Sequence, residues 1–291
     1  ANENTPMERA LKNSISNSIV ISTKIISDPD SVSGAILLDM KDVFITDHLT
    51  QIGYITGEWK KKYSLDKENS YYSNLISFPM NSEIDVMLHY KSSKPHDVFT
   101  LADSRSMYLR YHYSLSAIPE TDYRPRLADD RVGHFLTMYQ DYSTVESETP
   151  YVYYINRWHL EKVDPDSKLS PPKKPIVFWI ENTFPEKYRP AVRDGILAWN
   201  RSFERIGIKD AIVVKQMPDD AEWDPADVRY NVIRWIIQPG GGYAVGPSRA
   251  NPFTGELYDA DIRVSSDFVR HFYEEFNYQV NPVSDNKNTD E

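Results

Sequence analysis

The stretch that decides the fold of this chain covers residues 175–217 and reads PIVFWIENTFPEKYRPAVRDGILAWNRSFERIGIKDAIVVKQM. It opens with the compact apolar run Ile176–Ile180, which predicts a buried strand. Five apolar residues then recur at spacings of four, three, four and three, which places them on one helix face: Val192, Ile196, Trp199, Phe203 and Ile206. Pro190 suits the first turn of that helix, and Gly207 suits the position just after its end.

Further strands are predicted after this helix. Apolar runs cover Ala211–Met217, Val232–Ile237 and Leu257–Val264, and a serine at 265 or 266 can cap a helix that runs to about Phe276. A strand, a helix and then more strands are typical of a layered α/β arrangement. This part of the chain is therefore expected to hold a mixed twisted sheet with one long helix.

The first 166 residues are expected to be rich in β-structure. Apolar side chains alternate with polar ones over residues 84–90 and again over residues 107–113, which is the period of a half-buried strand. Three more strands are predicted at Ser18–Ile26, Ala35–Leu38 and Tyr151–Ile155, and a helix only within Val43–Ile52.

Three prolines in Ser167–Pro175 disfavour both helix interiors and central strands. The predicted organisation is a β-rich domain at 1–166, a linker at 167–175 and a second domain at 176–291. The fold class is α+β.

Composition narrows the classes of partner. The chain has 291 residues and a net charge of −10, which argues against nucleic acid or an anionic membrane as a partner. It has no cysteine, so disulfides, thiolate zinc ligands and a cysteine nucleophile are excluded. No apolar run has the roughly 20 residues of a transmembrane helix.

The histidines do not predict a metal site. The HExxH motif places two histidines four residues apart on one helix face, and no two of the seven histidines have that spacing. His271 with Glu274 and Glu275 is the nearest imitation, and an amphipathic surface helix explains it better. His89 and His112 can share one face of neighbouring strands, but no third ligand is identifiable.

Carboxylates offer weaker candidates. Asp259 and Asp261 flank Ala260, so both side chains are expected on one face, where such a pair can bind calcium or share a proton. A solvated face, or ion pairs with Arg249 and Arg263, is the favoured explanation.

Two further segments of the sequence are rich in charged residues. The acidic segment 219–227 lacks EF-hand spacing. Arginines in 121–135 can clamp one domain on another or simply decorate a loop. No nucleophile, base and orienting residue are placed together by the sequence.

The glycine-rich segment 238–247, QPGGGYAVGP, is not a phosphate loop because it lacks the required lysine and leads into a short extended segment. Two interpretations remain open. It is either a tight turn or an exposed edge strand that pairs with an extended peptide through main-chain hydrogen bonds.

Three segments together resemble a known family. MYLRYHYSLSAIPETDYRPRLADDRVGHF resembles the domain of unknown function that precedes the catalytic domain in bacterial zinc-dependent metalloproteases. PIVFWIE followed by YRPAVRDGILAWNRSFERIGI resembles the first strand and long helix of their metzincin-like catalytic domain, and NPFTGELYDADIRVSSDFV resembles a later strand of it.

The resemblance implies an endopeptidase in which a zinc-activated water hydrolyses peptide bonds. Its substrate would lie along the edge strand Gly242–Ser248, with these substrate-binding residues: Gly242, Tyr243, Ala244, Val245 and Gly246. The zinc ligands and the catalytic glutamate match no position here, so no catalytic or metal-binding residue is assigned. The chain alone is expected to be inactive and to hold no cofactor.

The expected partners are a peptide or protein substrate and a C-terminal catalytic subdomain outside this sequence. The expected location is periplasmic, cell-surface or secreted. Two alternatives stay open: a non-catalytic β-rich module that binds a peptide or a glycan, since aromatic faces suit such ligands, and an interaction domain without a ligand.

Overall fold

A computed structural model describes residues 5–16, 19, 22–47, 63–95, 97, 101–238 and 241–280. The chain divides into two compact units, Ala1–Ala117 and Ile118–Glu291, which are described separately. Part of the predicted strand Ser18–Ile26 and part of the predicted helix Val43–Ile52 lie outside the described residues.

The first unit contains a three-stranded antiparallel sheet in the order β1-β2-β3. Its described elements are the helices α1 (Pro6–Ser14) and α2 (Lys41–Phe44) and the strands β1 (Ser64–Ser77), β2 (Asn81–Lys91) and β3 (Ser106–Ser116). The strands predicted from alternation at 84–90 and 107–113 are confirmed as β2 and β3.

The strand β1 was not predicted. Its sequence SLDKENSYYSNLIS is polar and does not alternate, and its pairing with β2 shifts register between Asp66 and Tyr71. In contrast, the strands predicted at Ser18–Ile26 and Ala35–Leu38 are wrong over their described residues, where a single bridge joins Ile25 and Leu38. The two segments pair with each other through a few backbone hydrogen bonds, including that from the N–H of Ile26 to the carbonyl of Leu37, without forming regular strands over their described residues.

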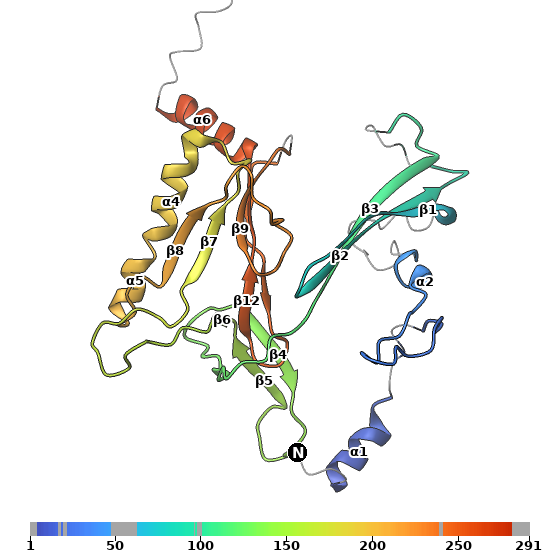
Figure 1. Ribbon diagram of the computed structural model, residues 1–291, viewed down its shortest axis with the longest axis horizontal. Helices are drawn as coiled ribbons and strands as arrows, with labels where there is room; N and C mark the ends of the chain where they lie inside the picture. The colour runs from blue at the N-terminus through green and yellow to red at the C-terminus, as the bar shows by residue number, and fades with distance from the viewer. Residues whose placement is uncertain are drawn as a thin grey trace, which may run out of the picture. The chain divides into compact units, whose positions relative to one another are not determined.

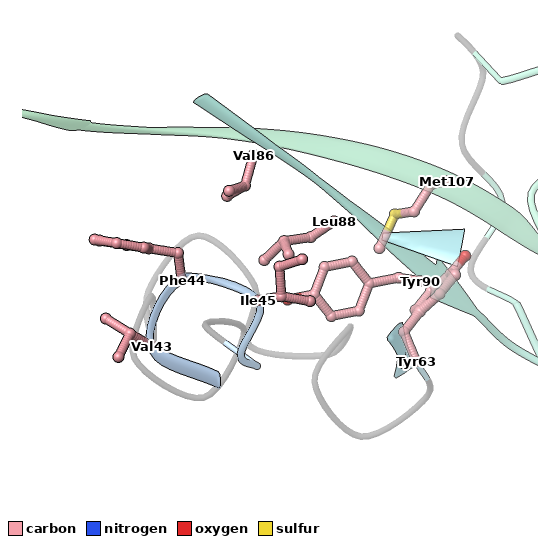
Figure 2. Close-up of a cluster of buried hydrophobic side chains, with 8 residues drawn as sticks. All are labelled: Val43, Phe44, Ile45, Tyr63, Val86, Leu88, Tyr90 and Met107. Atoms are coloured by element: carbon pink, nitrogen blue, oxygen red, sulfur yellow. The ribbon is translucent and has the colours of Figure 1, made fainter. Parts of the chain in front are cut away.

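One face of this sheet carries the core of the first unit (Figure 2). Val86, Leu88 and Tyr90 point from β2 to the side on which α2 places Phe44. The ring of Phe44 meets Tyr113 from β3 edge to face, with centroids 4.8 Å apart. Because successive residues of a strand point to opposite faces, the other face of the same sheet carries polar side chains.

The second unit holds three sheets and three described α-helices (Figure 1). The strands are β4 (Leu136–Gln140), β5 (Tyr151–Ile155), β6 (Arg157–Trp158), β7 (Ile176–Ile180), β8 (Ile212–Gln216), β9 (Asn231–Ile236), β10 (Ala244–Val245), β11 (Ser248–Ala250), β12 (Glu256–Ala260) and β13 (Ile262–Ser265). The helices are α4 (Arg189–Leu197), α5 (Asn200–Arg205) and α6 (Ser266–Gln279), with a 3-10 turn, η2, at Glu186–Tyr188.

The largest sheet has the order β10-β13-β9-β7-β8 and is parallel except for β10. A hairpin of β4 and β5 and a small sheet β11-β12-β6 complete the unit. The predicted strands at Tyr151–Ile155 and Ile176–Ile180 are confirmed to the residue, and those at 211–217 and 232–237 are confirmed within one residue at each end. The described chain is thus a mixture of helix and strand, rich in sheet, with one long helix.

The predicted single helix after β7 is divided. α4 and α5 lie along the sheet beside β8 and β7 (Figure 1), and a turn at 198–199 separates them. Val192, Ile196 and Phe203 pack against the core, whereas Trp199 is 64% exposed and Ile206 is 67% exposed. The prediction of one continuous helix is therefore wrong, and of its five apolar residues only Val192, Ile196 and Phe203 contribute to the core.

Gly207 ends α5 as predicted. Its φ of 87° lies in the left-handed region that favours glycine. The N–H of Gly207 donates to the carbonyl of Glu204, and the N–H of Ile208 donates to that of Phe203. These two bonds are the pair that closes a Schellman motif.

The Pro-rich segment 167–175 lies within the second unit. Ser170 is 2% exposed, its N–H donates to the carbonyl of Gly207, and its carbonyl accepts from Lys209. The division by contacts falls between Ala117 and Ile118 instead. The domain limits 1–166, 167–175 and 176–291 stay a prediction. Within the described part of the chain, no helix is both long and apolar enough to cross a membrane.

Candidate functional site

The predicted substrate-binding segment includes a strand at the edge of the five-stranded sheet. Among the described strands, β10 pairs only with β13, and Ala244 lies opposite Val264. The N–H of Ser265 donates to the carbonyl of Tyr243 at 3.0 Å. Because hydrogen-bonded and non-bonded pairs alternate along an antiparallel ladder, the N–H and C=O of Ala244 point away from β13.

The side chains of this segment are partly open to solvent. Tyr243 is 39% exposed and Val245 is 40% exposed. These two residues share a face, and Ala244 points to the other face. The five predicted residues are therefore adjacent in the structure, with polar main-chain groups directed to an open edge.

The glycines next to β10 have a role inside the chain. A Cβ added to Gly242 would lie 3.4 Å from the carbonyl oxygen of Asp267 in α6. A Cβ added to Gly246 would lie 3.4 Å from Cγ1 of Ile262 in β13. Both contacts are at the short end of ordinary van der Waals distance, so small residues here let β10 approach its own neighbours closely.

Two carboxylates lie where β12 passes into β13. Asp259 is 3% exposed and its Oδ2 accepts from Nε of Arg249 at 3.1 Å. Burial, reinforced by the nearby charge of Asp261, raises the pKa of Asp259 to about 7. Asp261 accepts a hydrogen bond from the N–H of Val232 at 3.0 Å, and burial also raises its pKa.

The sequence favoured a solvated face, or ion pairs with Arg249 and Arg263, for these two carboxylates. The ion pair between Asp259 and Arg249 is confirmed. The solvated face is wrong for Asp259, because β11 and β12 bring it into the interior of the unit.

A second cluster surrounds His159 and was not predicted. Nδ1 of His159 lies 3.3 Å from Glu256, and Nε2 lies 3.4 Å from Glu161. Thr121 donates to the same Glu256, and Lys173 pairs with Glu161 at 2.8 Å. The cluster opens into a cavity of about 520 Å³ lined by Glu120, Thr121, Asp122, His159, Glu161, Lys173 and Lys174.

A third cluster lies on the polar face of the sheet in the first unit. His112 sits between two buried carboxylates, with Nε2 2.6 Å from Glu83 and Nδ1 2.8 Å from Asp85. Arg110 pairs with Asp85 at 2.7 Å, and its hydrogen bond is the main reason that the pKa of Asp85 falls to about 2.

The two histidines predicted to share a sheet face do so. His112 lies opposite Asp85 in the register, and His89 lies opposite Tyr108, so both side chains stand on the polar face. They engage different carboxylates, His112 as above and His89 with Asp66. The two ring nitrogens of His112 each contact a different carboxylate. These groups therefore do not point at one common position where a metal could bind.

The described side chains do not form a site for a zinc ion. Over the described ranges, no group of three or more histidine, aspartate or glutamate side chains is arranged to hold a metal. A zinc site needs at least three protein ligands around one point. No chemical step is therefore assigned to a metal held by this chain.

The remaining charged segments pair locally. Asp129 accepts a 2.5 Å hydrogen bond from Arg131, two residues away. Asp227 likewise pairs with Arg229, and Trp223 stacks on Tyr230 with centroids 4.1 Å apart. Both segments are folded back on themselves.

Comparison with known proteins identifies one family. A family model described as a domain of unknown function (DUF5117) matches residues 1–163, more than half of the chain. No curated protein and no solved structure matches the chain significantly. The match includes the first unit and the β4–β5 hairpin and ends shortly after His159.

Proposed function

The chain belongs to the DUF5117 family, whose function is unknown, and we propose that it is the N-terminal part of a zinc-dependent endopeptidase. In this proposal β10 is the edge strand along which a peptide substrate lies. The zinc ion and its general base belong to residues of the parent protein outside this sequence. The parent acts in the periplasm, at the cell surface or as a secreted protein.

The observation that supports the proposal best is the position of β10 at the open edge of the sheet. An extended peptide can add to such an edge through main-chain hydrogen bonds, with the N–H and C=O of Ala244 as its partners. The resemblance of residues 175–264 to metzincin-like domains led to the same segment independently.

The geometry defines how a peptide would be held. Tyr243 and Val245 present half-exposed side chains on one face of the strand, where they can line pockets for alternate peptide side chains. Main-chain pairing supplies affinity that depends little on sequence, and the pockets supply selectivity.

The test replaces Ala244 with proline, which removes the outward N–H while the hydrogen bond from Ser265 to the carbonyl of Tyr243 stays in place. A proline is tolerated on an edge strand when its N–H side faces solvent. Binding of fluorescein-labelled ten-residue peptides from a casein digest is measured by anisotropy. One lost hydrogen bond is expected to weaken binding by about fivefold.

Ala244→Ser is the matched control because it keeps the N–H and adds one polar atom. Equal affinity of the Ala244→Pro and Ala244→Ser variants for every peptide that binds would contradict the proposal.

A second candidate function rests on the β4–β5 hairpin. Tyr151 and Tyr153 are 40% and 39% exposed, and their rings stack at 6.2 Å between centroids. Such a pair can contact the apolar face of a sugar ring, as a glycan-binding module would. Retention of the chain on insoluble cellulose or chitin, lost in a Tyr151→Ala/Tyr153→Ala variant, would favour this function over peptide binding.

A further inference from the structure

Three side chains of the first unit form a continuous hydrogen-bonded series that no motif in the sequence indicates. Oδ2 of Asp66 lies 3.2 Å from Nδ1 of His89, and Nε2 of the same ring lies 2.8 Å from Oγ of Ser106. We propose that Ser106, His89 and Asp66 are a nucleophile, base and orienting carboxylate that transfer acyl groups from small esters. The geometry is that by which a catalytic triad is recognised, whatever the fold or chain order.

The irregular part of β1 builds the carboxylate end of the series. Four residues of β1 stand unpaired between Asp66 and Tyr71, where the register with β2 shifts. Two of them hold the orienting residue: Nδ2 of Asn69 donates to Oδ2 of Asp66 at 2.9 Å, and Oγ of Ser70 donates to its carbonyl at 2.7 Å. Bulges recur next to active sites because they re-aim a side chain.

The base is held on several sides. The backbone N–H of His89 donates to Oγ of Ser70 at 3.0 Å, and the ring of Tyr108 lies 4.8 Å from the imidazole. The side chain of His89 is 12% exposed and that of Asp66 is 9% exposed. A base in this position has few rotamers open to it, so Nε2 stays directed at the serine.

The nucleophile is accessible. Ser106 is an exposed residue that begins β3, directly opposite Lys91 in the register. The side chain of Lys91 stands on the same sheet face and its Nζ lies 3.3 Å from Oδ2 of Asp66. Its ammonium group is thus paired with the orienting carboxylate, and it adds positive charge to the sheet face that carries Ser106.

The charges favour the required protonation states. The hydrogen bond from Asn69 is the largest contribution that lowers the pKa of Asp66, to about 2, so the carboxylate is ionised at neutral pH. An ionised carboxylate at Nδ1 keeps the proton on that nitrogen and leaves Nε2 to accept the proton of the serine hydroxyl. The groups that contact the imidazole are Asp66 from β1 and Ser106 and Tyr108 from β3. Ser70 accepts from the backbone N–H of His89, and Lys91 of β2 pairs with Asp66.

The proposed step balances without a cofactor. Oγ of Ser106 bonds to the acyl carbon, its proton passes to Nε2 of His89, and the carbonyl π electrons move to the carbonyl oxygen. Collapse re-forms the carbonyl and breaks the ester C–O bond, and the leaving alkoxide takes the proton from Nε2. Water then attacks the acyl-serine, gives its proton to Nε2 and releases the carboxylic acid as the serine recovers its proton.

The same contacts also stabilise the sheet, so the test must measure reactivity at the serine. The chain contains no cysteine, and Ser106→Cys therefore introduces a single thiol. Next to His89 this thiol is expected to ionise at lower pH and to react with iodoacetamide at pH 6 at least about tenfold faster than the thiol of Ser77→Cys. Ser77 is an exposed residue of β1 whose hydroxyl meets only Ser82 among the contacts that the structure gives it.

The decisive comparison adds His89→Gln to each cysteine variant. Loss of the rate advantage in Ser106→Cys/His89→Gln, with circular dichroism unchanged, supports activation by the imidazole. Equal rates for the thiols at 106 and 77, or a rate at 106 that does not respond to the loss of His89, would overturn the proposal.

The unmodified chain supplies the second measurement. A fluorophosphonate probe is expected to add covalently to Ser106, with the adduct located by peptide mass spectrometry. The Ser106→Ala, His89→Gln and Asp66→Asn variants should lose most of the labelling. Labelling spread evenly over exposed serines, or the absence of any adduct at Ser106, would refute the assignment.

Discussion

Asp259 and Arg249 face each other across the β11–β12 pair, with Nε of the arginine 3.1 Å from Oδ2 of the carboxylate. Oδ1 of the same carboxylate is buried and accepts no hydrogen bond from any described group. One arginine therefore compensates only part of the cost of burying this charge beside Asp261.

Stability of the second unit should fall as pH rises from about 4 to about 7. The folded pKa of Asp259 is about 7, above its ordinary value of 3.8, so the folded state holds a proton that the unfolded state releases in this window. Below the unfolded pKa the carboxyl is neutral in both states and costs nothing; above the folded pKa the penalty is complete, at about 4 kcal/mol.

Asp259→Asn should flatten this dependence. Denaturant unfolding followed by tryptophan fluorescence suits the measurement because five tryptophans lie in the second unit: Trp158, Trp179, Trp199, Trp223 and Trp235. If the free energy of unfolding falls between pH 4 and 7 as steeply in the Asp259→Asn variant as in the parent chain, another group is responsible.

The first unit should lose stability at acid pH. The folded pKa of Asp85 is about 2, below its ordinary value, so its ion pair with Arg110 stabilises the fold above the unfolded pKa. That contribution disappears as pH falls from about 4 to about 2.

Hydrogen exchange of the β2 and β3 amides, measured by mass spectrometry, reports on this unit alone. Arg110→Gln is expected to lower the protection of these amides against exchange at pH 6. It should also make that protection depend less on pH. Protection in the parent chain that stays constant from pH 4 to pH 2 would contradict the prediction.

Gly255→Ala should destabilise the second unit by about 2 kcal/mol or more. Its φ of 75° is unfavourable for alanine, and an added Cβ would lie 2.7 Å from the carbonyl oxygen of Ile155. The backbone of Arg157 donates to the carbonyl of Gly255, so a shift there also disturbs the entry to β6.

Gly195→Ala is the matched control. Gly195 lies inside α4, and a Cβ added there meets nothing within 4 Å. Because alanine is the better helix former, this variant should gain about 0.5–1 kcal/mol. If the free energy of unfolding changes in the same direction in both variants, relative to the parent chain, the backbone explanation is refuted.

Asn231→Ala should cost about 2 kcal/mol, because one side chain joins three strands. Nδ2 of Asn231 in β9 donates to the carbonyl of Val177 in β7 at 2.8 Å, and Oδ1 accepts from the N–H of Ala260 in β12 at 2.9 Å. Its loss leaves a donor and an acceptor of the backbone without partners.

Asn182→Ala serves as the comparison, since Asn182 makes one long bond of 3.4 Å to the carbonyl of Pro218. It should cost well under 1 kcal/mol. If both variants lower the melting temperature equally, the two hydrogen bonds of the Asn231 side chain do not contribute to stability as predicted.

Several elements were predictable because their signal is local. The alternation over residues 84–90 and the compact run Ile176–Ile180 each describe which side of a strand is buried, and the structure places strands there. β1 was missed because most of its residues are polar and exposed, so its sequence shows no alternation of apolar and polar side chains. Trp199 was predicted to lie within one continuous helix, whereas it lies in the turn between α4 and α5 and is exposed.

The sequence by itself determined the position of most strands, the end of α5 at Gly207 and the exclusion of a cysteine-based site, because each depends on residue type or on neighbours a few positions away. Only the tertiary structure decided which polar groups meet. Asp66, His89 and Ser106 are brought together by strand register. Strand order likewise buries Asp259 and leaves β10 at an edge. Pairing between distant strands sets these relationships, and no local period of apolar residues encodes them.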